Sequence, residues 1–239
     1  MGGKNSVERR VEMAQKTGVV NFKEMNLKKF PTQLLQIPNL RTLDISDNAF
    51  SDGINCDLSQ LSALKSLILS RCKLYSLPVS IYRLKKLETL DVHGNFFTEV
   101  SEAIGDMAAL KSINLSNNRL KRLPHTINTL RHLNILECGD NKISSLPDSF
   151  STCTAVEINL NRNSLSTLPL SIKDCSRLKT LRLEENCLSI DDNLRAILKS
   201  SAISLLCLDG NLFTNKQLEN LEEFAEYTTR FTATKKKIF

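Results

Sequence analysis

The chain has 239 residues, of which 41% are hydrophobic and 24% charged, and its formal net charge is +6. This hydrophobic content is typical of a globular protein, and no apolar run approaches the roughly 18 residues of a membrane-spanning helix. Seven scattered cysteines argue against a disulfide framework and for a reducing compartment, and the polar N-terminus is unlike a signal peptide.

The first six residues, Met1 to Ser6, fit the N-myristoylation motif M-G-x-x-x-[ST]. The motif predicts a myristoyl group on Gly2, and the alternative is an ordinary N-terminus without a lipid. One acyl chain binds membranes weakly and reversibly, so a second signal is needed. Nearby basic residues would supply it: Lys4, Arg9, Arg10 and Lys16. We therefore expect a cytoplasmic protein that is attached reversibly to the cytoplasmic faces of membranes.

Residues 7–16 are predicted to form a helix with Ser6 as its N-cap and Gly18 at its C-terminal end. Apolar residues at helical spacing, Val7, Val11 and Ala14, lie on one face of it. A repeat array needs a cap with a polar outer face, so this helix is expected to cover the first repeat.

One pattern, L-x-x-L-x-L-x-x-N/C-x-L, then recurs at intervals of 22 to 25 residues. Its Asn or Cys position is occupied by Asn48, Cys72, Asn95, Asn118, Asn141, Asn163, Asn186 and Asn211. Residues 17–31 resemble a degenerate copy in which Met25 replaces the Asn, so we expect a capping unit there. Regular repetition of this kind predicts one elongated body with a continuous core.

Each L-x-L segment alternates and is therefore predicted to be a short strand with its leucines inward, stacked on its neighbours as a parallel sheet. The Asn should end the strand and bond backbone groups where the chain turns inward, which gives a ladder of Asn side chains. Cys72 interrupts this ladder and, like Cys138, is expected to be a small buried residue.

The segments between the strands follow the pattern L-P-x-x-I-x-x-L-x-x-L, as in residues 77–87. Apolar residues three apart favour a short 3₁₀ or α turn on the convex side. The segment after Asn186 is longer, and Asp191 and Asp192 there predict a capped true helix.

The periodicity changes after Phe213. Thr214 and Gln217 form a predicted capping box. An apolar stripe at helical spacing follows and predicts one helix that closes the C-terminal end: Leu218, Leu221, Phe224 and Ala225. The basic tail, residues 235–239, is expected to be a solvated end. The predicted division is a lipidation signal and cap helix (1–17), the repeats (18–213), and a C-terminal cap with its tail (214–239).

The repeating unit resembles that of intracellular leucine-rich repeat proteins of the Ras-suppressor and plant Ras-group type. Three stretches, residues 14–19, 181–188 and 230–237, are similar to small myristoylated members of that class. The resemblance implies an α/β leucine-rich repeat solenoid, a right-handed βα superhelix of horseshoe shape, with a concave parallel sheet and helical end caps. It also implies a small myristoylated adaptor with no catalytic residues. The sequence has no P-loop, GxGxxG or HExxH pattern and no metal-spaced Cys/His cluster, so no cofactor or metal is expected.

The residues flanking the inward leucines should form the concave face. Those predicted to bind a partner are Asp44, Asp91, His93, Glu137, Glu157, Asn159, Asn161, Arg182, Glu184 and Asp209. Acidic residues predominate among them although the whole chain is positive, so a protein with a basic patch is the expected partner. The face has neither the basic groove nor the aromatic residues of a nucleic-acid site, and we expect no nucleic acid.

The predicted function is thus a non-catalytic interaction scaffold, expected to be a monomer. One alternative is a soluble regulator or inhibitor that covers a basic enzyme surface without a lipid. A second is an enzyme centred on Asp91 and His93, which share a face and lie near several serines. An accidental grouping on a serine-rich surface is the favoured interpretation of these residues, because no oxyanion hole or pocket is indicated.

Overall fold

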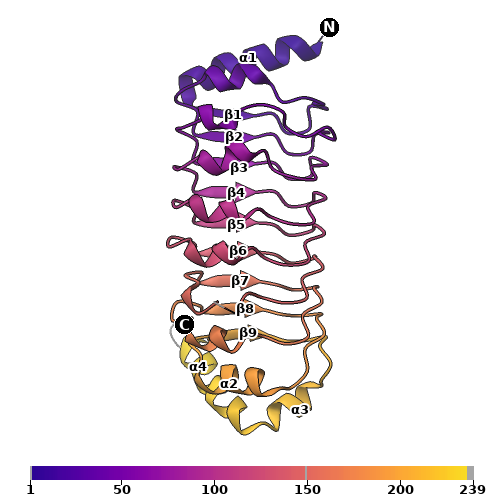
Figure 1. Ribbon diagram of the computed structural model, residues 1–239, viewed down its shortest axis with the longest axis vertical. Coiled ribbons are helices and arrows are strands. Elements are labelled where there is room, and N and C mark those ends of the chain that lie inside the picture. Colours follow the sequence, from indigo (N-terminus) through magenta and orange to yellow (C-terminus); the bar gives the residue numbers. More distant parts are fainter. Residues whose placement is uncertain (1, 149, 236–239) are drawn as a thin grey trace.

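The computed structural model describes residues 2–148 and 150–235 (Figure 1). Within these ranges nine three-residue strands form one parallel sheet, in which each strand pairs with the next along the chain. They are β1 (Val19–Asn21), β2 (Thr42–Asp44), β3 (Ser66–Ile68), β4 (Thr89–Asp91), β5 (Ser112–Asn114), β6 (Ile135–Glu137), β7 (Glu157–Asn159), β8 (Thr180–Arg182) and β9 (Leu205–Cys207). The predicted solenoid is therefore confirmed, with one strand for each repeat.

The middle residue of every strand faces the core. Leu43 pairs in register with Leu67, and Leu67 with Leu90, so equivalent leucines stack from repeat to repeat. These three leucines are fully buried, whereas the residues on either side are partly exposed. A one-residue slip would expose the whole stack, so the hydrophobic pattern fixes the register.

Short 3₁₀ helices cover the opposite side of the core, as the residue spacing predicts. They are η1 (Thr32–Gln36), η2 (Leu58–Gln60), η3 (Val79–Arg83), η4 (Glu102–Asp106), η5 (His125–Thr129), η6 (Phe150–Thr152) and η7 (Leu170–Asp174). Several begin after a proline in extended conformation, such as Pro78 at φ −63° and ψ 140°. The predicted true helix is also present as α2 (Asp192–Ser200), and the Asp191 side chain accepts from the Leu194 N–H at 2.8 Å.

Asn95 shows how the predicted Asn ladder is built. Its Oδ1 accepts from the backbone N–H groups of Cys72 and Leu74 at 3.0 and 2.9 Å. Its Nδ2 donates to the carbonyls of Leu69 and Val92 at 2.9 and 2.8 Å. One side chain that is 3% exposed thus serves two adjacent repeats. Because buried backbone groups must be paired, the ladder joins each repeat to its neighbour.

At Cys72 the Asn ladder is interrupted, and a different set of hydrogen bonds takes its place. Its thiol donates to the Ile45 carbonyl, with a separation of 3.1 Å, but a thiol offers no strong acceptor. The Phe50 N–H bonds instead to the backbone carbonyl of Cys72 at 2.9 Å. Burial raises the pKa of this thiol to about 11, so it behaves as a small buried hydrophobe, as predicted.

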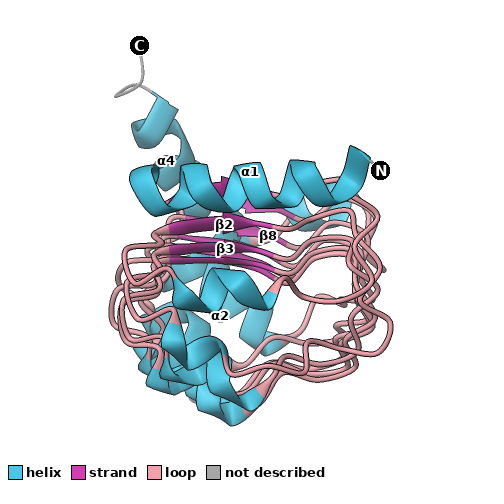
Figure 2. Cartoon of the chain, turned by 90° about the horizontal axis from the view of Figure 1, so that it is seen from above, coloured by secondary structure: helices cyan, strands magenta, loops and turns pink. Residues whose placement is uncertain are grey.

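The N-terminal cap is longer than predicted. Helix α1 (Gly2–Thr17) begins before Ser6, so Ser6 lies inside the helix and the prediction of Ser6 as its N-cap is wrong. No proline interrupts residues 2–6, and the helical hydrogen-bond pattern extends through them. The predicted end is confirmed, because Gly18 has φ +70° and its N–H bonds to the Ala14 carbonyl at 2.8 Å. Figure 2 shows α1 lying across the end of the solenoid.

The C-terminal cap consists of two helices where the apolar stripe predicts one: α3 (Asn215–Glu219) and α4 (Glu222–Lys235). The predicted Thr214–Gln217 capping box is present. The chain turns at residues 220–221, so Ala225 is exposed and Tyr227 is buried instead. Residues 236–239 of the predicted basic tail lie outside the described residues.

The turn lets α4 satisfy two sets of backbone groups at the end of the solenoid. The Tyr227 hydroxyl lies 3.0 Å from the Leu206 N–H and 3.3 Å from the Leu206 carbonyl, both on the edge strand β9. The Arg230 guanidinium donates to the carbonyls of Ile203, Lys199 and Leu198, two of which belong to the last turn of α2. This helix therefore protects a sheet edge and caps α2.

Candidate functional site

The predicted concave residues lie together on one side of the sheet. Glu157 begins a strand, whereas each of the others ends a strand or follows it by two residues; all are partly exposed, with Asp209 the most open. Glu137, Asn159 and Arg182 pair in register on β6, β7 and β8. The periodicity therefore placed these side chains correctly, whereas their pairings became visible only in the structure.

Several of these residues are engaged in holding the strand ends. Asp44 Oδ1 accepts from the Ser46 N–H at 2.9 Å and from its hydroxyl at 2.6 Å. Asn159 accepts from the Asn161 N–H at 3.0 Å in the same way. Side chains of this type commonly bond a backbone N–H two residues on, so their first role here is to shape the turn.

The C-terminal half of the face carries a paired and an unpaired set of charges. Arg182 bonds Glu157 across neighbouring strands, and this carboxylate keeps the pKa of the guanidinium above its usual value. Asn161 donates to Glu184. Among the described residues, no side-chain partner is found for Glu137 or Asp209. Arg182, one of the predicted partner-binding residues, is thus already occupied, and Glu137 and Asp209 are carboxylates free to bond a cation.

His93 lies within a chain of polar contacts in the N-terminal half. Its Nδ1 is 2.8 Å from Asp91 Oδ1, and its Nε2 is 2.8 Å from Arg71 Nη1. Arg71 also donates to both carboxylate oxygens of Asp47. A guanidinium can only donate, so Nε2 accepts and Nδ1 carries the proton toward Asp91. Both ring nitrogens are therefore engaged by neighbouring side chains.

This geometry weakens the enzyme hypothesis centred on Asp91 and His93. A catalytic histidine needs its second nitrogen directed at a nucleophile, but Arg71 occupies Nε2. Ser70, two residues after the neighbouring strand β3, is 2% exposed and so inaccessible to a substrate. The arrangement has the form of a charged network that positions side chains on the face.

A row of charged residues beside the face was missed in the sequence. It occupies the position immediately before the ladder residue, and its charged members are Asp47, Arg71, Asp140, Arg162 and Glu185. All have φ between +51° and +56°, because the chain turns inward there. Arg162 lies 3.6 Å from Asp140 and 3.2 Å from Glu185. The fixed spacing and alternating sign of these residues could have revealed the row.

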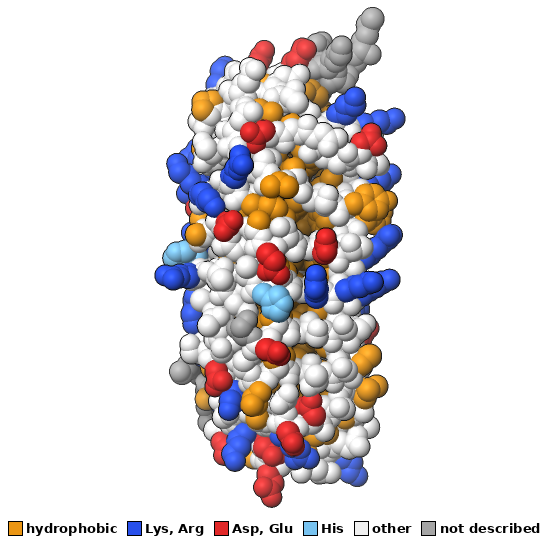
Figure 3. All heavy atoms as spheres, in the orientation of Figure 1, with side chains coloured by type: hydrophobic (Ala, Val, Ile, Leu, Met, Phe, Trp, Pro, Cys, Tyr) orange, Lys and Arg blue, Asp and Glu red, His pale blue; other side chains and the backbone are white. Residues whose placement is uncertain are grey.

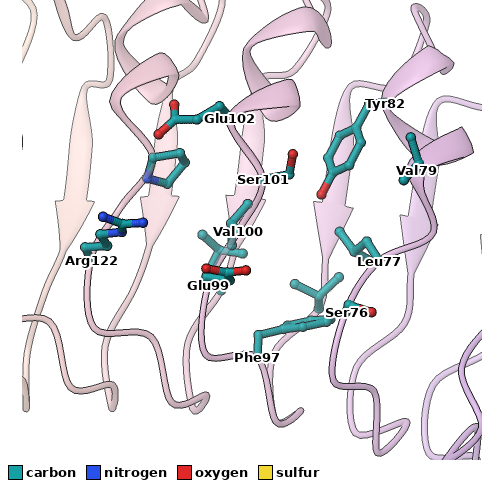
Figure 4. A pocket seen from close by; sticks show the side chains of 13 residues that line it. Ser76, Leu77, Val79, Tyr82, Phe97, Glu99, Val100, Ser101, Glu102 and Arg122 are labelled. Atoms are coloured by element: carbon teal, nitrogen blue, oxygen red, sulfur yellow. The ribbon is translucent and has the colours of Figure 1, made fainter.

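A separate cavity of about 290 Å³ lies between η3 and η4. Here Val100 and Ser101 stand where neighbouring repeats have Leu-Pro, as at Leu77 and Pro78, and the smaller side chains leave space. Figure 4 shows the Tyr82 ring and Ser101 beside this space. Burial raises the pKa of Tyr82, while hydrogen bonds to Ser101 oppose the shift. The cavity is thus explained by an irregular repeat and is not part of the concave face.

Cys207, at the concave end of β9, lies near carboxylates. Burial and the neighbouring Glu184 raise the pKa of its thiol. A reactive thiolate needs the opposite environment, so this residue is a weak nucleophile.

Positive side chains gather away from the concave acids. Figure 3 shows Lys and Arg side chains along both long edges of the molecule. On the edge where the strands begin, Glu88 lies between Lys65 at 3.0 Å and Lys111 at 2.6 Å. Cations therefore flank the acidic concave face along the edges of the molecule.

Glu88 provides a pH-dependent prediction. Its hydrogen bonds to Lys111 and then Lys65 lower the carboxyl pKa to about 2, from the usual value of 4.5. A depressed folded-state pKa means that this stabilisation is complete above pH 4.5 and is lost as the pH falls toward 2. Acid unfolding followed by circular dichroism should therefore show a shallower pH dependence in Glu88→Gln. Identical acid profiles for the two proteins would contradict the prediction.

Comparisons with known proteins agree with this architecture. Residues 39–61 and 62–120 match two leucine-rich repeat models. Among solved structures, the leucine-rich repeat protein LIC12759 of Leptospira interrogans has a TM-score of 0.68 at 26% identity, over 90% of this chain and 61% of that one. The ectodomain of the Arabidopsis thaliana receptor kinase GASSHO1/SCHENGEN3 has a TM-score of 0.60 at 24% identity, over 77% of this chain and 26% of that one.

One curated relative is the transforming growth factor beta activator LRRC33 of Danio rerio, which is 29% identical over 219 residues. That match covers 87% of this chain but 28% of the relative, so the chain spans a minor part of its length. The repeats, the parallel sheet and these matches define a leucine-rich repeat solenoid. Residues 39–120 thus carry recognisable leucine-rich repeats, and the described chain as a whole has the fold of a leucine-rich repeat solenoid. Among the described residues, no helix is long and apolar enough to cross a membrane.

Proposed function

We propose that this protein is a non-catalytic interaction scaffold that binds a protein partner through the acidic part of its concave face. The observation that carries the proposal is a pair of concave carboxylates, Glu137 and Asp209, for which the described residues provide no side-chain hydrogen bond or ion pair, on a surface where the other acids are engaged. Unpaired charges on a rigid sheet steer a partner of opposite sign and determine its orientation. A basic patch on the partner would supply the complementary charge.

Charge reversal tests this proposal. We expect Glu137→Lys/Asp209→Lys to lose partners that the wild-type protein captures from cell extract by affinity purification. The matched control is Asp106→Lys/Asp174→Lys, which reverses two exposed carboxylates on the convex side and changes the net charge equally. Equal loss of partners in both variants would point to net charge alone, and an unchanged set in both would rule out the concave face.

We further propose that a myristoyl group on Gly2 attaches the protein reversibly to cytoplasmic membrane faces. The motif at residues 2–6 and the basic residues of α1, among them Arg9 and Lys16, support this proposal. The narrower resemblance to small myristoylated adaptors leads to the same expectation. Mass spectrometry of the mature N-terminus from a eukaryotic host should detect the acyl group, and Gly2→Ala should move the protein from the membrane pellet to the supernatant.

The rival is a soluble regulator that covers a basic enzyme surface without any lipid. It predicts an unmodified N-terminus, equal sedimentation of the wild-type protein and Gly2→Ala, and loss of the enzyme partner in the concave variant. The two measurements therefore separate the lipid anchor from the binding face, and each hypothesis can fail by itself.

A further inference from the structure

A positively charged cleft lies at the N-terminal end of the edge where the strands begin. Its volume is about 350 Å³, and its charged lining residues are Lys16, Arg41, Lys65 and Lys86, with no carboxylate among the residues that line it. The four cations come from α1 and from the segments that lead into β2, β3 and β4. Segments distant in the sequence thus converge on one basic site.

The repeat geometry explains why these charges are close together. Arg41 and Lys65 each immediately precede a strand, and those two strands are neighbours in the sheet. Adjacent strands lie about 4.8 Å apart, so the two side chains leave the backbone at neighbouring points, and both line the cleft. An anion bound in the cleft would experience the summed field of the cluster.

Two of the four cations have few competing contacts. Lys16 and Lys86 are exposed, and the described residues include no carboxylate within ion-pair distance of either. Arg41 donates to the Thr17 carbonyl at 3.4 Å, a bond that leaves its charge uncompensated. Lys65 alone is paired, with Glu88, and Glu88 also binds Lys111. The cleft therefore keeps most of its positive charge.

Helix α1 connects this cleft to the proposed acylation site. Gly2, Arg9, Met13 and Lys16 occupy positions i, i+7, i+11 and i+14, which fall on one side of a helix. The opposite side, which includes the fully buried Ala14, packs on the first repeat. Met13 lies on the outward side and is 53% exposed. Lys16 belongs to both the outward side of the helix and the cleft.

We propose that the cleft of Lys16, Arg41, Lys65 and Lys86 binds the phosphate of an anionic lipid headgroup, with the molecule tilted so that the outward side of α1 and the adjoining N-terminal part of the strand-start edge both face the bilayer. The proposal rests on the proposed myristoyl anchor, for which it supplies the second membrane signal. Because α1 crosses the end of the solenoid (Figure 2), the later repeats would extend away from this contact. The concave face would then remain accessible to a protein partner.

The test measures sedimentation of the myristoylated protein with two kinds of vesicle: phosphatidylcholine alone, and a four-to-one mixture of phosphatidylcholine and phosphatidylserine. The test variant is Lys65→Gln/Lys86→Gln. The matched control, Arg177→Gln/Lys179→Gln, removes two cations from equivalent repeat positions beside β8 on the same edge. Four strand spacings, about 19 Å, separate the two pairs, which exceeds the screening length at physiological salt.

Each cation near an anionic surface changes binding about fivefold. We therefore expect the test variant to bind the mixed vesicles roughly 30-fold more weakly, while its binding to neutral vesicles is unchanged and the control stays within about twofold of the wild-type protein. Glu88→Gln, which removes a neighbouring negative charge, should strengthen binding to the mixed vesicles. Equal losses of vesicle binding in the test variant and the control would overturn the proposal that the cleft binds lipid. The absence of a loss in either variant would overturn it as well.

Two further arms identify which proposal fails. Inorganic phosphate, compared with chloride at equal ionic strength, should not displace the protein from mixed vesicles; selective displacement would show a site for a soluble anion and overturn the lipid assignment. Gly2→Ala should lose binding to neutral vesicles. If it does not, the lipid anchor of the proposed function fails, whereas the charge dependence of the cleft is still measured separately.

Discussion

Replacing Asn95 by alanine is expected to destabilise the protein by roughly 2–4 kcal/mol, because several buried backbone groups would lose their partners at once. The side chain accepts from Cys72 and Leu74 and donates to Leu69 and Val92, so the loss affects two repeats. Each repeat is stabilised by its neighbours, and a break in the middle of the array weakens the whole. Urea unfolding followed by circular dichroism measures the change.

Cys72→Ala is the internal control for this result. In other repeats the ladder side chain accepts a hydrogen bond from the equivalent backbone N–H. Here that group is the Phe50 N–H, which donates to the backbone carbonyl of Cys72, so the bond survives the substitution. The variant loses only thiol contacts, which are weak, so its cost should be about 1 kcal/mol. Equal destabilisation by Asn95→Ala and Cys72→Ala would mean that the ladder hydrogen bonds are not the cause.

The second large effect is expected at the C-terminal cap, where Arg230→Met should cost about 2–3 kcal/mol. Methionine keeps an apolar stem but leaves the carbonyls of Lys199, Leu198 and Ile203 without their charged donor. Those of Lys199 and Leu198 lie in the last turn of α2, where a positive charge also interacts favourably with the helix dipole. The free energy of unfolding and proteolysis of the C-terminal segment both report the loss.

Arg195→Met provides the comparison at the same interface. Arg195 forms an ion pair with Glu223 at 3.3 Å, and its side chain is 41% exposed. Exposed pairs of this kind contribute about 0–1 kcal/mol, so this variant should remain close to the wild-type protein. A larger effect for Arg195→Met than for Arg230→Met would contradict the view that backbone capping holds α4 in place.

The sequence was most informative where a residue is buried. A leucine such as Leu90 recurs at the same position of each repeat and is stable only in the apolar core. Its place in the repeat therefore predicts the strand, the register of the strand and the burial of the side chain. The same logic located the Asn ladder, the 3₁₀ segments, and the true helix after Asp191. The start of α1 and the division of the C-terminal cap were missed because helix ends depend on weak local signals.

For the charged surfaces, too, the sequence determines one part of the arrangement and the tertiary structure the other. Spacing alone determined that Asp91, His93, Glu157 and Arg182 share a face, since alternation along a strand is fixed by the backbone. Only the tertiary structure decided that Arg182 is bound to Glu157 and that His93 lies between Asp91 and Arg71. It also decided that cations from four segments form one cleft. Such groupings depend on which long, flexible side chains meet across neighbouring strands. The repeat pattern specifies the buried positions of each unit but not the charges on the next unit, so it does not determine these contacts.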